Sequence, residues 1–171
     1  MHEEGKATEQ LMAAVCVLAT GGELNALTAL VDDEGVDLTF KRRAGTRTLD
    51  VQVKARFSDE SESKAVRELG CFMADAYEDT FRPRDDLYML YALIHAPRAD
   101  IETAWLVPSE VFAAKGLHVT IHGRPHVRFQ ASVKPDSKDK WVAYRYSREA
   151  LPRRLLAVVT SLEPGSGGSE R

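Results

Sequence analysis

Two neighbouring stretches that alternate between apolar and polar residues constrain this chain more than any other feature. Residues 36–41 carry an apolar side chain at every second position, and residues 49–56 repeat the pattern. Because successive side chains of a strand point to opposite faces, this period predicts two strands with one buried face each. Between them, Arg43-Ala44-Gly45-Thr46 predicts the turn of a hairpin.

The polar face of this hairpin collects three groups of different chemistry. A turn centred on Ala44 and Gly45 places Asp37 opposite Gln52, and Lys54 follows on the same face. A carboxylate, an amide and an ammonium on one face of two adjacent strands form a candidate site for a metal ion and a water molecule. Asp50 shares the face but lies nearer the tip, so we treat it as a secondary candidate.

The remaining pattern predicts a single α/β domain with a mixed central sheet flanked by helices. Residues 4–20 have helical spacing of apolar residues and end at Gly21-Gly22. Residues 23–31 fit a strand or a short helix, and we favour the strand because Asp32-Asp33-Glu34-Gly35 predicts a turn after it. We further expect a helix at 58–80, a central strand at 87–94, a strand at 104–107, a helix at 108–114, a hairpin at 118–131, an extended segment at 141–146 and a helix at 147–162.

Length and composition fit a folded protein of one domain. The chain has 171 residues, of which 44% are hydrophobic and 29% charged. We expect a domain over residues 1–163 and an unstructured tail over 164–171, where glycine and serine dominate. The chain has no apolar run long enough to cross a membrane, its polar start is unlike a secretory signal, and its two cysteines predict free thiols. We therefore expect a cytoplasmic protein without a membrane partner.

The net charge of −3 argues against a protein coated in positive charge, but it leaves room for local basic clusters. Lys41, Arg42, Arg43 and Arg47 surround the predicted turn, and Arg56 follows Lys54 on the second strand. Such cations are suited to contact the phosphates of a DNA backbone. The alternative is that the turn is simply a solvated hairpin tip.

Gly35-Val36-Asp37 and Gln52-Val53-Lys54, after a helix that carries Glu9, resemble the motif of the PD-(D/E)XK nuclease superfamily, also called restriction-endonuclease-like. The resemblance is to the branch whose last motif reads Gln-x-Lys, which includes many uncharacterised bacterial proteins. It covers roughly residues 4 to 115. Gln52 departs from the commonest pattern, which has an acid there, and this removes one negative charge from the site.

The resemblance implies a DNA endonuclease that depends on Mg²⁺ or Mn²⁺ and acts as a homodimer, since cutting two strands needs two sites. Asp37 would bind the metal together with the Gln52 amide oxygen and the Val53 carbonyl. Lys54 would orient the attacking water or stabilise charge on the phosphate. Glu9 would complete the site from the helix, and Glu23 is a rival for that role.

Other functions remain open at this point. The same scaffold is suited to a catalytically inactive domain that binds nucleic acid, or to a module that binds another protein. A zinc site at His118, His122 and His126 is a further alternative, since all three histidines fall on one predicted hairpin.

Overall fold

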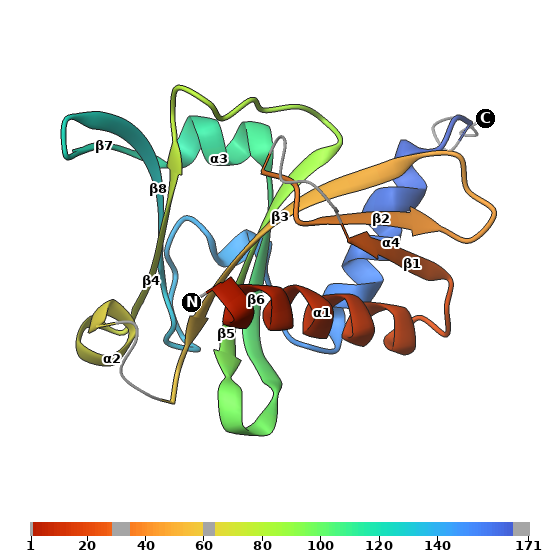
Figure 1. Ribbon diagram of the computed structural model, residues 1–171, viewed down its shortest axis with the longest axis horizontal. Coiled ribbons are helices and arrows are strands. Elements are labelled where there is room, and N and C mark those ends of the chain that lie inside the picture. Colours follow the sequence, from red (N-terminus) through yellow and green to blue (C-terminus); the bar gives the residue numbers. More distant parts are fainter. Residues whose placement is uncertain (1, 29–34, 60–63, 166–171) are drawn as a thin grey trace.

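The computed structural model describes residues 2–28, 35–59 and 64–165 (Figure 1). The α-helices are α1 His2–Ala19, α2 Lys64–Leu69, α3 Ser109–Lys115 and α4 Ala150–Leu162, and the 3₁₀ turns are η1 Ala96–Arg98 and η2 Val142–Tyr144. The strands are β1 Leu24–Thr28, β2 Leu38–Arg42, β3 Thr48–Phe57, β4 Cys71–Tyr77, β5 Leu87–His95, β6 Asp100–Pro108, β7 Leu117–Ile121, β8 Arg124–Ser132 and β9 Arg145–Tyr146.

Six strands form the larger sheet, in the order β1-β2-β3-β5-β6-β9. The sheet is mixed, because β3 and β5 are parallel while β5 and β6 are antiparallel. The predicted central strand is confirmed: β5 lies between β3 and β6 and is buried along most of its length. The fold class predicted from the sequence, an α/β domain with a mixed central sheet and flanking helices, is confirmed.

The predicted hairpin is present with the predicted register. Leu38 pairs with Val51, and Thr39 pairs with Asp50, so the pairing converges on a turn at Ala44 and Gly45. The Gly45 N–H donates to the Arg42 carbonyl at 2.9 Å, which closes the turn. Since this register follows from the sequence period and the turn, the polar residues of β2 and β3 share one face, as predicted.

Helices α1 and α4 cover one face of the larger sheet (Figure 1). Met12 and Cys16 of α1, together with Leu155 of α4, belong to the same buried cluster as Val51 on β3. The predicted end of α1 is confirmed, because Gly21 and Gly22 adopt φ values of 59° and 78°, a conformation that glycine allows without strain.

A second sheet of three strands, in the order β4-β8-β7, packs over the opposite face. An aromatic cluster fills the space between the sheets. Tyr91 of β5 stacks on Phe129 of β8 with ring centroids 3.8 Å apart, and Phe72 of β4 lies 5.5 Å from Trp105 of β6. The polar side of the β2–β3 hairpin therefore faces the second sheet and not the helices.

The helix predicted at 58–80 is wrong over most of its length. The structure has only the short helix α2, followed by strand β4. Phe72 and Ala76 fit a helical face, but Phe72 and Ala74 are also spaced for the buried side of a strand. Pairing with β8, from Cys71 opposite Ser132 to Tyr77 opposite His126, stabilises the strand and is invisible to local periodicity.

The ends of the predicted elements differ in smaller ways. Strand β1 confirms the strand over the short helix in residues 23–31, while the turn predicted at Asp32-Asp33-Glu34 lies outside the described residues. The extended segment at 141–146 is a 3₁₀ turn followed by the short strand β9. Of the predicted tail, residues 166–171 lie outside the described part of the chain. Among the described residues, none of the helices has the length and apolar character needed to cross a membrane.

Candidate active site

Asp37 lies where the chain enters β2, and two hydrogen bonds tie it to β3. Its backbone N–H donates to the Val51 carbonyl at 3.0 Å, and its Oδ2 accepts a hydrogen bond from the Val53 N–H at 2.6 Å. These two contacts flank Gln52 on the neighbouring strand. The carboxylate is therefore fixed against the backbone of β3 between the positions of Gln52 and Lys54.

Gln52 and Lys54 line one cavity of about 810 Å³. Both side chains are half-buried, and neither makes a side-chain hydrogen bond or ion pair with another residue of the described chain. Gly35 also lines the cavity, with φ of 70°, and a Cβ there would lie 2.9 Å from Gln52 Nε2. Glycine at this position thus gives the Gln52 amide the room that it occupies. Asp37 is not among the cavity-lining residues.

The opposite wall of this cavity comes from the second sheet and the loop after β4. It consists of Asp75, Ala76, Tyr77, Thr80, Phe81, Arg82, Arg84 and His126, and Leu87 at the start of β5 also lines the cavity. Asp75 is held by two hydrogen bonds from the Arg128 guanidinium, at 2.7 and 3.0 Å. The Tyr77 ring lies 4.7 Å from the His126 ring and 3.7 Å from the Arg124 guanidinium. The wall is therefore aromatic and cationic with one neutralised carboxylate.

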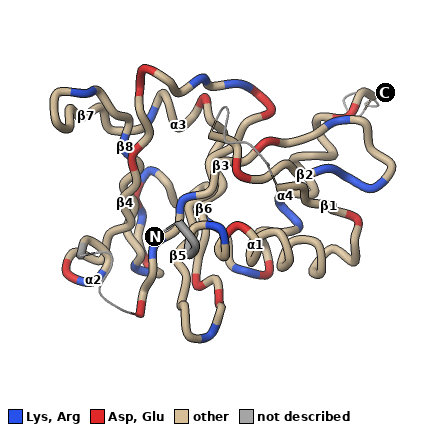
Figure 2. The backbone as a smooth tube through the Cα atoms, in the orientation of Figure 1, with Lys and Arg blue, Asp and Glu red and all other residues tan. Residues whose placement is uncertain are grey.

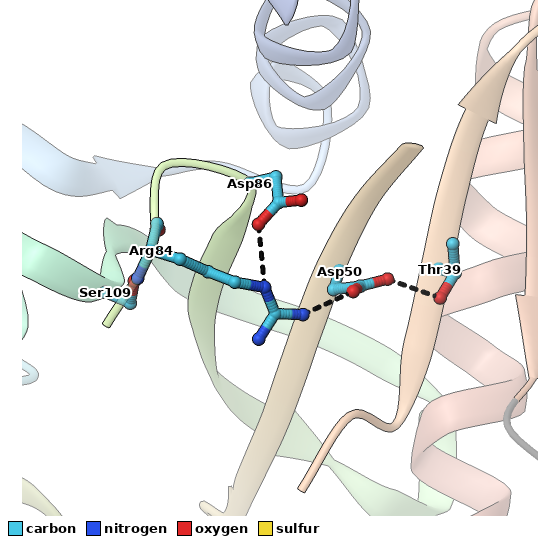
Figure 3. Close-up of polar contacts among 5 residues, drawn as sticks. All are labelled: Thr39, Asp50, Arg84, Asp86 and Ser109. Carbon is cyan, nitrogen blue, oxygen red and sulfur yellow. Dashed lines mark hydrogen bonds and ion pairs between the residues drawn. The ribbon is translucent and has the colours of Figure 1, made fainter. Parts of the chain in front are cut away.

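Arg84 joins this wall to the hairpin (Figure 3). Its guanidinium contacts Asp50 through Nη2 and Asp86 through Nε, the latter at 2.7 Å, and Asp50 also accepts a hydrogen bond from Thr39 at 2.7 Å. Burial lowers the pKa of Arg84, but the two carboxylates outweigh it and leave the pKa raised. Asp50, the secondary candidate, is thus engaged in an ion pair.

The backbone of Arg84 is fixed as firmly as its side chain. The hydroxyl of Ser109, at the start of α3, accepts a hydrogen bond from the Arg84 N–H at 2.9 Å and donates one to the Arg84 carbonyl at 2.8 Å. Ser109 is fully buried. The loop that forms the cavity wall is therefore anchored to β3 on one side and to α3 on the other.

The predicted basic residues fall in two different places. Arg42, Arg43 and Arg47 are exposed at the β2–β3 turn, which lies beside the end of α4 (Figure 2). Arg56 is half-buried, with its guanidinium over the Phe72 ring at 5.8 Å and donating to the Ala55 carbonyl at 2.7 Å. Burial lowers the pKa of Arg56 despite the nearby charge of Asp75.

The structure does not bring either candidate glutamate into the cavity. Glu9 is ion-paired with Lys6 at 2.7 Å on α1, the helix that covers the other face of the sheet. Glu23 lies 3.7 Å from Arg43 near the turn. The cavity-lining residues found in the described chain include neither of them.

The donors beside the cavity suit a hard cation better than zinc. Within the described residues, no three His, Cys, Asp or Glu side chains are grouped so that they could hold a metal ion. Asp37 and Gln52 offer oxygen atoms, which Mg²⁺ accepts when water and a phosphate fill the remaining positions. Of the three histidines named as an alternative zinc site, His118 and His126 lie on opposite faces of the hairpin, because His118 pairs with Val127, the neighbour of His126.

No protein-family model matches the chain, and no curated protein matches it either. Among solved structures, the fold is similar to that of a bacterial homing endonuclease, I-Ssp6803I, with a TM-score of 0.54. The match covers 92% of this chain and 97% of the other at 18% identity. The chain therefore shares the fold of that structure over nearly its whole length.

Sequence reasoning missed the residues of the second wall. Asp75, Arg84 and His126 come from three separate segments, and only the folded chain places them opposite Gln52 and Lys54. Residues 72–76 place Phe72, Ala74 and Ala76 on one side and Asp75 on the other, a spacing that also fits a strand with a polar group on its second side.

Proposed function

We propose that this protein is a metal-dependent endonuclease that hydrolyses DNA phosphodiester bonds. The observation that carries the proposal is the placement of Gln52 and Lys54, which line one cavity, with the Asp37 carboxylate held at Val53 between them. The homing-endonuclease-like fold supports this proposal, because the predicted motif falls on paired strands of a fold shared with a nuclease.

In the proposed site, Asp37 and the Gln52 amide oxygen hold the cation, Mg²⁺ or Mn²⁺, and the Val53 carbonyl is the further candidate donor. The cation would neutralise the phosphate and lower the pKa of a bound water. Lys54, which lines the cavity, stabilises negative charge that grows on the phosphate or orients the water. Glu9 lies on the other face of the sheet, so its proposed role is to orient the site indirectly and not to bind the cation.

DNA is the proposed substrate, and the exposed cations of the β2–β3 turn are proposed to contact its backbone. Cleavage of both strands would need two sites, so we propose a homodimer that acts in the cytoplasm. Equilibrium sedimentation of the protein with and without a DNA duplex tests the dimer. A measured mass of one chain under both conditions would contradict it.

Relaxation of supercoiled plasmid in Mg²⁺ or Mn²⁺ tests the activity. We expect the wild type to nick or linearise the plasmid, and Asp37→Ala and Lys54→Ala to lose at least about a hundredfold in rate. Matched controls are Asp136→Ala and Lys138→Ala, which remove the same groups from exposed positions outside the cavity. Both controls should cleave like the wild type.

Three outcomes would contradict the proposal. Cleavage by Asp37→Ala or Lys54→Ala at the wild-type rate would show that the substituted residue does not belong to the catalytic site. Binding of DNA by the wild type without cleavage in either metal would favour the inactive nucleic-acid-binding domain, and neither binding nor cleavage would favour a protein-interaction module.

A further inference from the structure

The β2–β3 turn holds an anion of the chain itself. The Glu163 carboxylate accepts hydrogen bonds from the Thr46 N–H at 2.8 Å, the Thr46 hydroxyl at 2.8 Å and the Arg47 N–H at 2.9 Å. Gly45 lies against the same carboxylate, and a Cβ there would collide with Glu163 Oε1. The turn is thus a cradle of converging donors around one carboxylate.

Glu163 is an unusual residue at its own place in the chain. It follows α4 as the C-terminal capping residue, where the helix dipole disfavours a negative charge. Hydrogen bonds from Arg47 and Thr46, with the charge of Arg42, lower the pKa of its carboxyl group. The turn, and not the helix, therefore holds the charged carboxylate in position.

The donor set of this cradle is the set that proteins use for a phosphate. It combines two backbone N–H groups, a hydroxyl and flanking arginines, all on the exposed tip of a hairpin. A carboxylate and a phosphate oxygen make the same charge-assisted contacts with such donors. Glu163 occupies the cradle in the way that one edge of a phosphate would.

We propose that the turn formed by Arg42, Arg43, Thr46 and Arg47 binds a backbone phosphate of DNA, and that Glu163 is the intramolecular anion that this phosphate displaces. The inference rests on the proposed action on DNA and assigns the turn a defined contact in it. Arg47, one residue before β3, and Gln52 are separated by about 17 Å of extended chain, at roughly 3.3 Å per residue. The phosphate in the cradle is therefore a different one from the phosphate at the cavity.

Binding without cleavage tests this inference. The probe is a fluorescein-labelled DNA duplex of two helical turns, and its anisotropy is measured in EDTA over a range of salt concentrations. Glu163→Gln keeps an oxygen for the turn and removes the competing charge. We expect it to bind the duplex roughly three- to tenfold more tightly at about 0.1 M salt, with a salt slope steeper by about 0.9.

Two controls separate this effect from a change in net charge. Glu110→Gln removes the same charge from the exposed surface of α3 and should bind like the wild type. The double variant with Arg47→Ala should lose the gain of Glu163→Gln. The amide resonances of Thr46 and Arg47 should also shift when the duplex is added to the wild type, a readout that needs no variant to fold.

Binding of Glu163→Gln at wild-type strength or weaker, an equal gain in Glu110→Gln, or unmoved amides of Thr46 and Arg47 would overturn the inference. Because the measurement is made in EDTA, its result is independent of cleavage. Lys54→Ala should lose cleavage and keep the effect of Glu163→Gln, so the failure of the proposed activity and the failure of the phosphate site are distinguishable.

Discussion

The Asp37 carboxylate accepts a hydrogen bond from the Val53 N–H at 2.6 Å, which links the entrance of β2 to the middle of β3. The contact fixes the acid between two residues whose side chains line the cavity, Gln52 and Lys54. It also gives Asp37 a structural role in addition to the proposed catalytic one. The two roles respond differently to substitution.

Asp37→Asn keeps an oxygen that can accept from Val53, whereas Asp37→Ala leaves that N–H without its acceptor. We expect Asp37→Asn to change the free energy of unfolding by less than about 0.5 kcal/mol and Asp37→Ala to lower it by about 1–2 kcal/mol. Both variants should lose cleavage. Urea denaturation and the plasmid assay measure the two quantities, and full cleavage by a stable Asp37→Asn would mean that the carboxylate is only structural.

Ser109→Ala removes both hydrogen bonds that fix the backbone of Arg84. Since Ser109 is fully buried, the loss leaves an N–H and a carbonyl without this partner, and we expect the free energy of unfolding to fall by about 1–3 kcal/mol. Denaturant unfolding measures it. A loss smaller than about 0.5 kcal/mol in Ser109→Ala would argue against a special role of Ser109.

Phe72→Ala tests the strand β4. Phe72 is fully buried against Tyr91, Trp105 and Phe129, so its truncation should lower the free energy of unfolding by about 3–5 kcal/mol. Leu69 is 71% exposed, and Leu69→Ala should cost less than about 0.5 kcal/mol. On a continuous helix the two residues would share a face, so similar losses in both variants would favour the helix.

Cys16 gives the protein a sensitivity to high pH. Burial raises the pKa of Cys16 from 9.0 to about 12, so the thiol stays neutral in the folded chain while it ionises in the unfolded chain. Its contribution to stability is present in full below pH 9.0 and is lost as the pH rises toward about 12.

Urea denaturation at about pH 8 and about pH 10.5 measures this effect, and the expected loss is roughly 2 kcal/mol. Other groups titrate in the same range, so Cys16→Ala is the reference. Cys16→Ala is less stable at neutral pH because it leaves a small cavity, but the difference from the wild type should shrink as the pH rises. A constant difference would show that Cys16 does not ionise on unfolding.

Local pattern in the sequence determined the hairpin that carries the candidate site. The period of two and the turn at Ala44 and Gly45 specify both the face and the register, because a shift by one residue would expose Val51 and bury Gln52. The C-terminal end of α1 and the burial of β5 followed from local signals of the same kind, namely Gly21-Gly22 and a continuous apolar run.

The tertiary structure alone decided what faces that hairpin. Residues 71–77 are spaced for either a helix or a strand, and pairing with β8, far away in the sequence, selects the strand. The same pairing brings Asp75 and His126 to the cavity, while a buried hydroxyl of α3 holds Arg84 beside Asp50. Local periodicity indicates which side of a helix or strand is buried. Long-range packing determines which other element buries that side. The walls of the cavity are formed by elements that meet in this way, so the sequence pattern alone does not predict them.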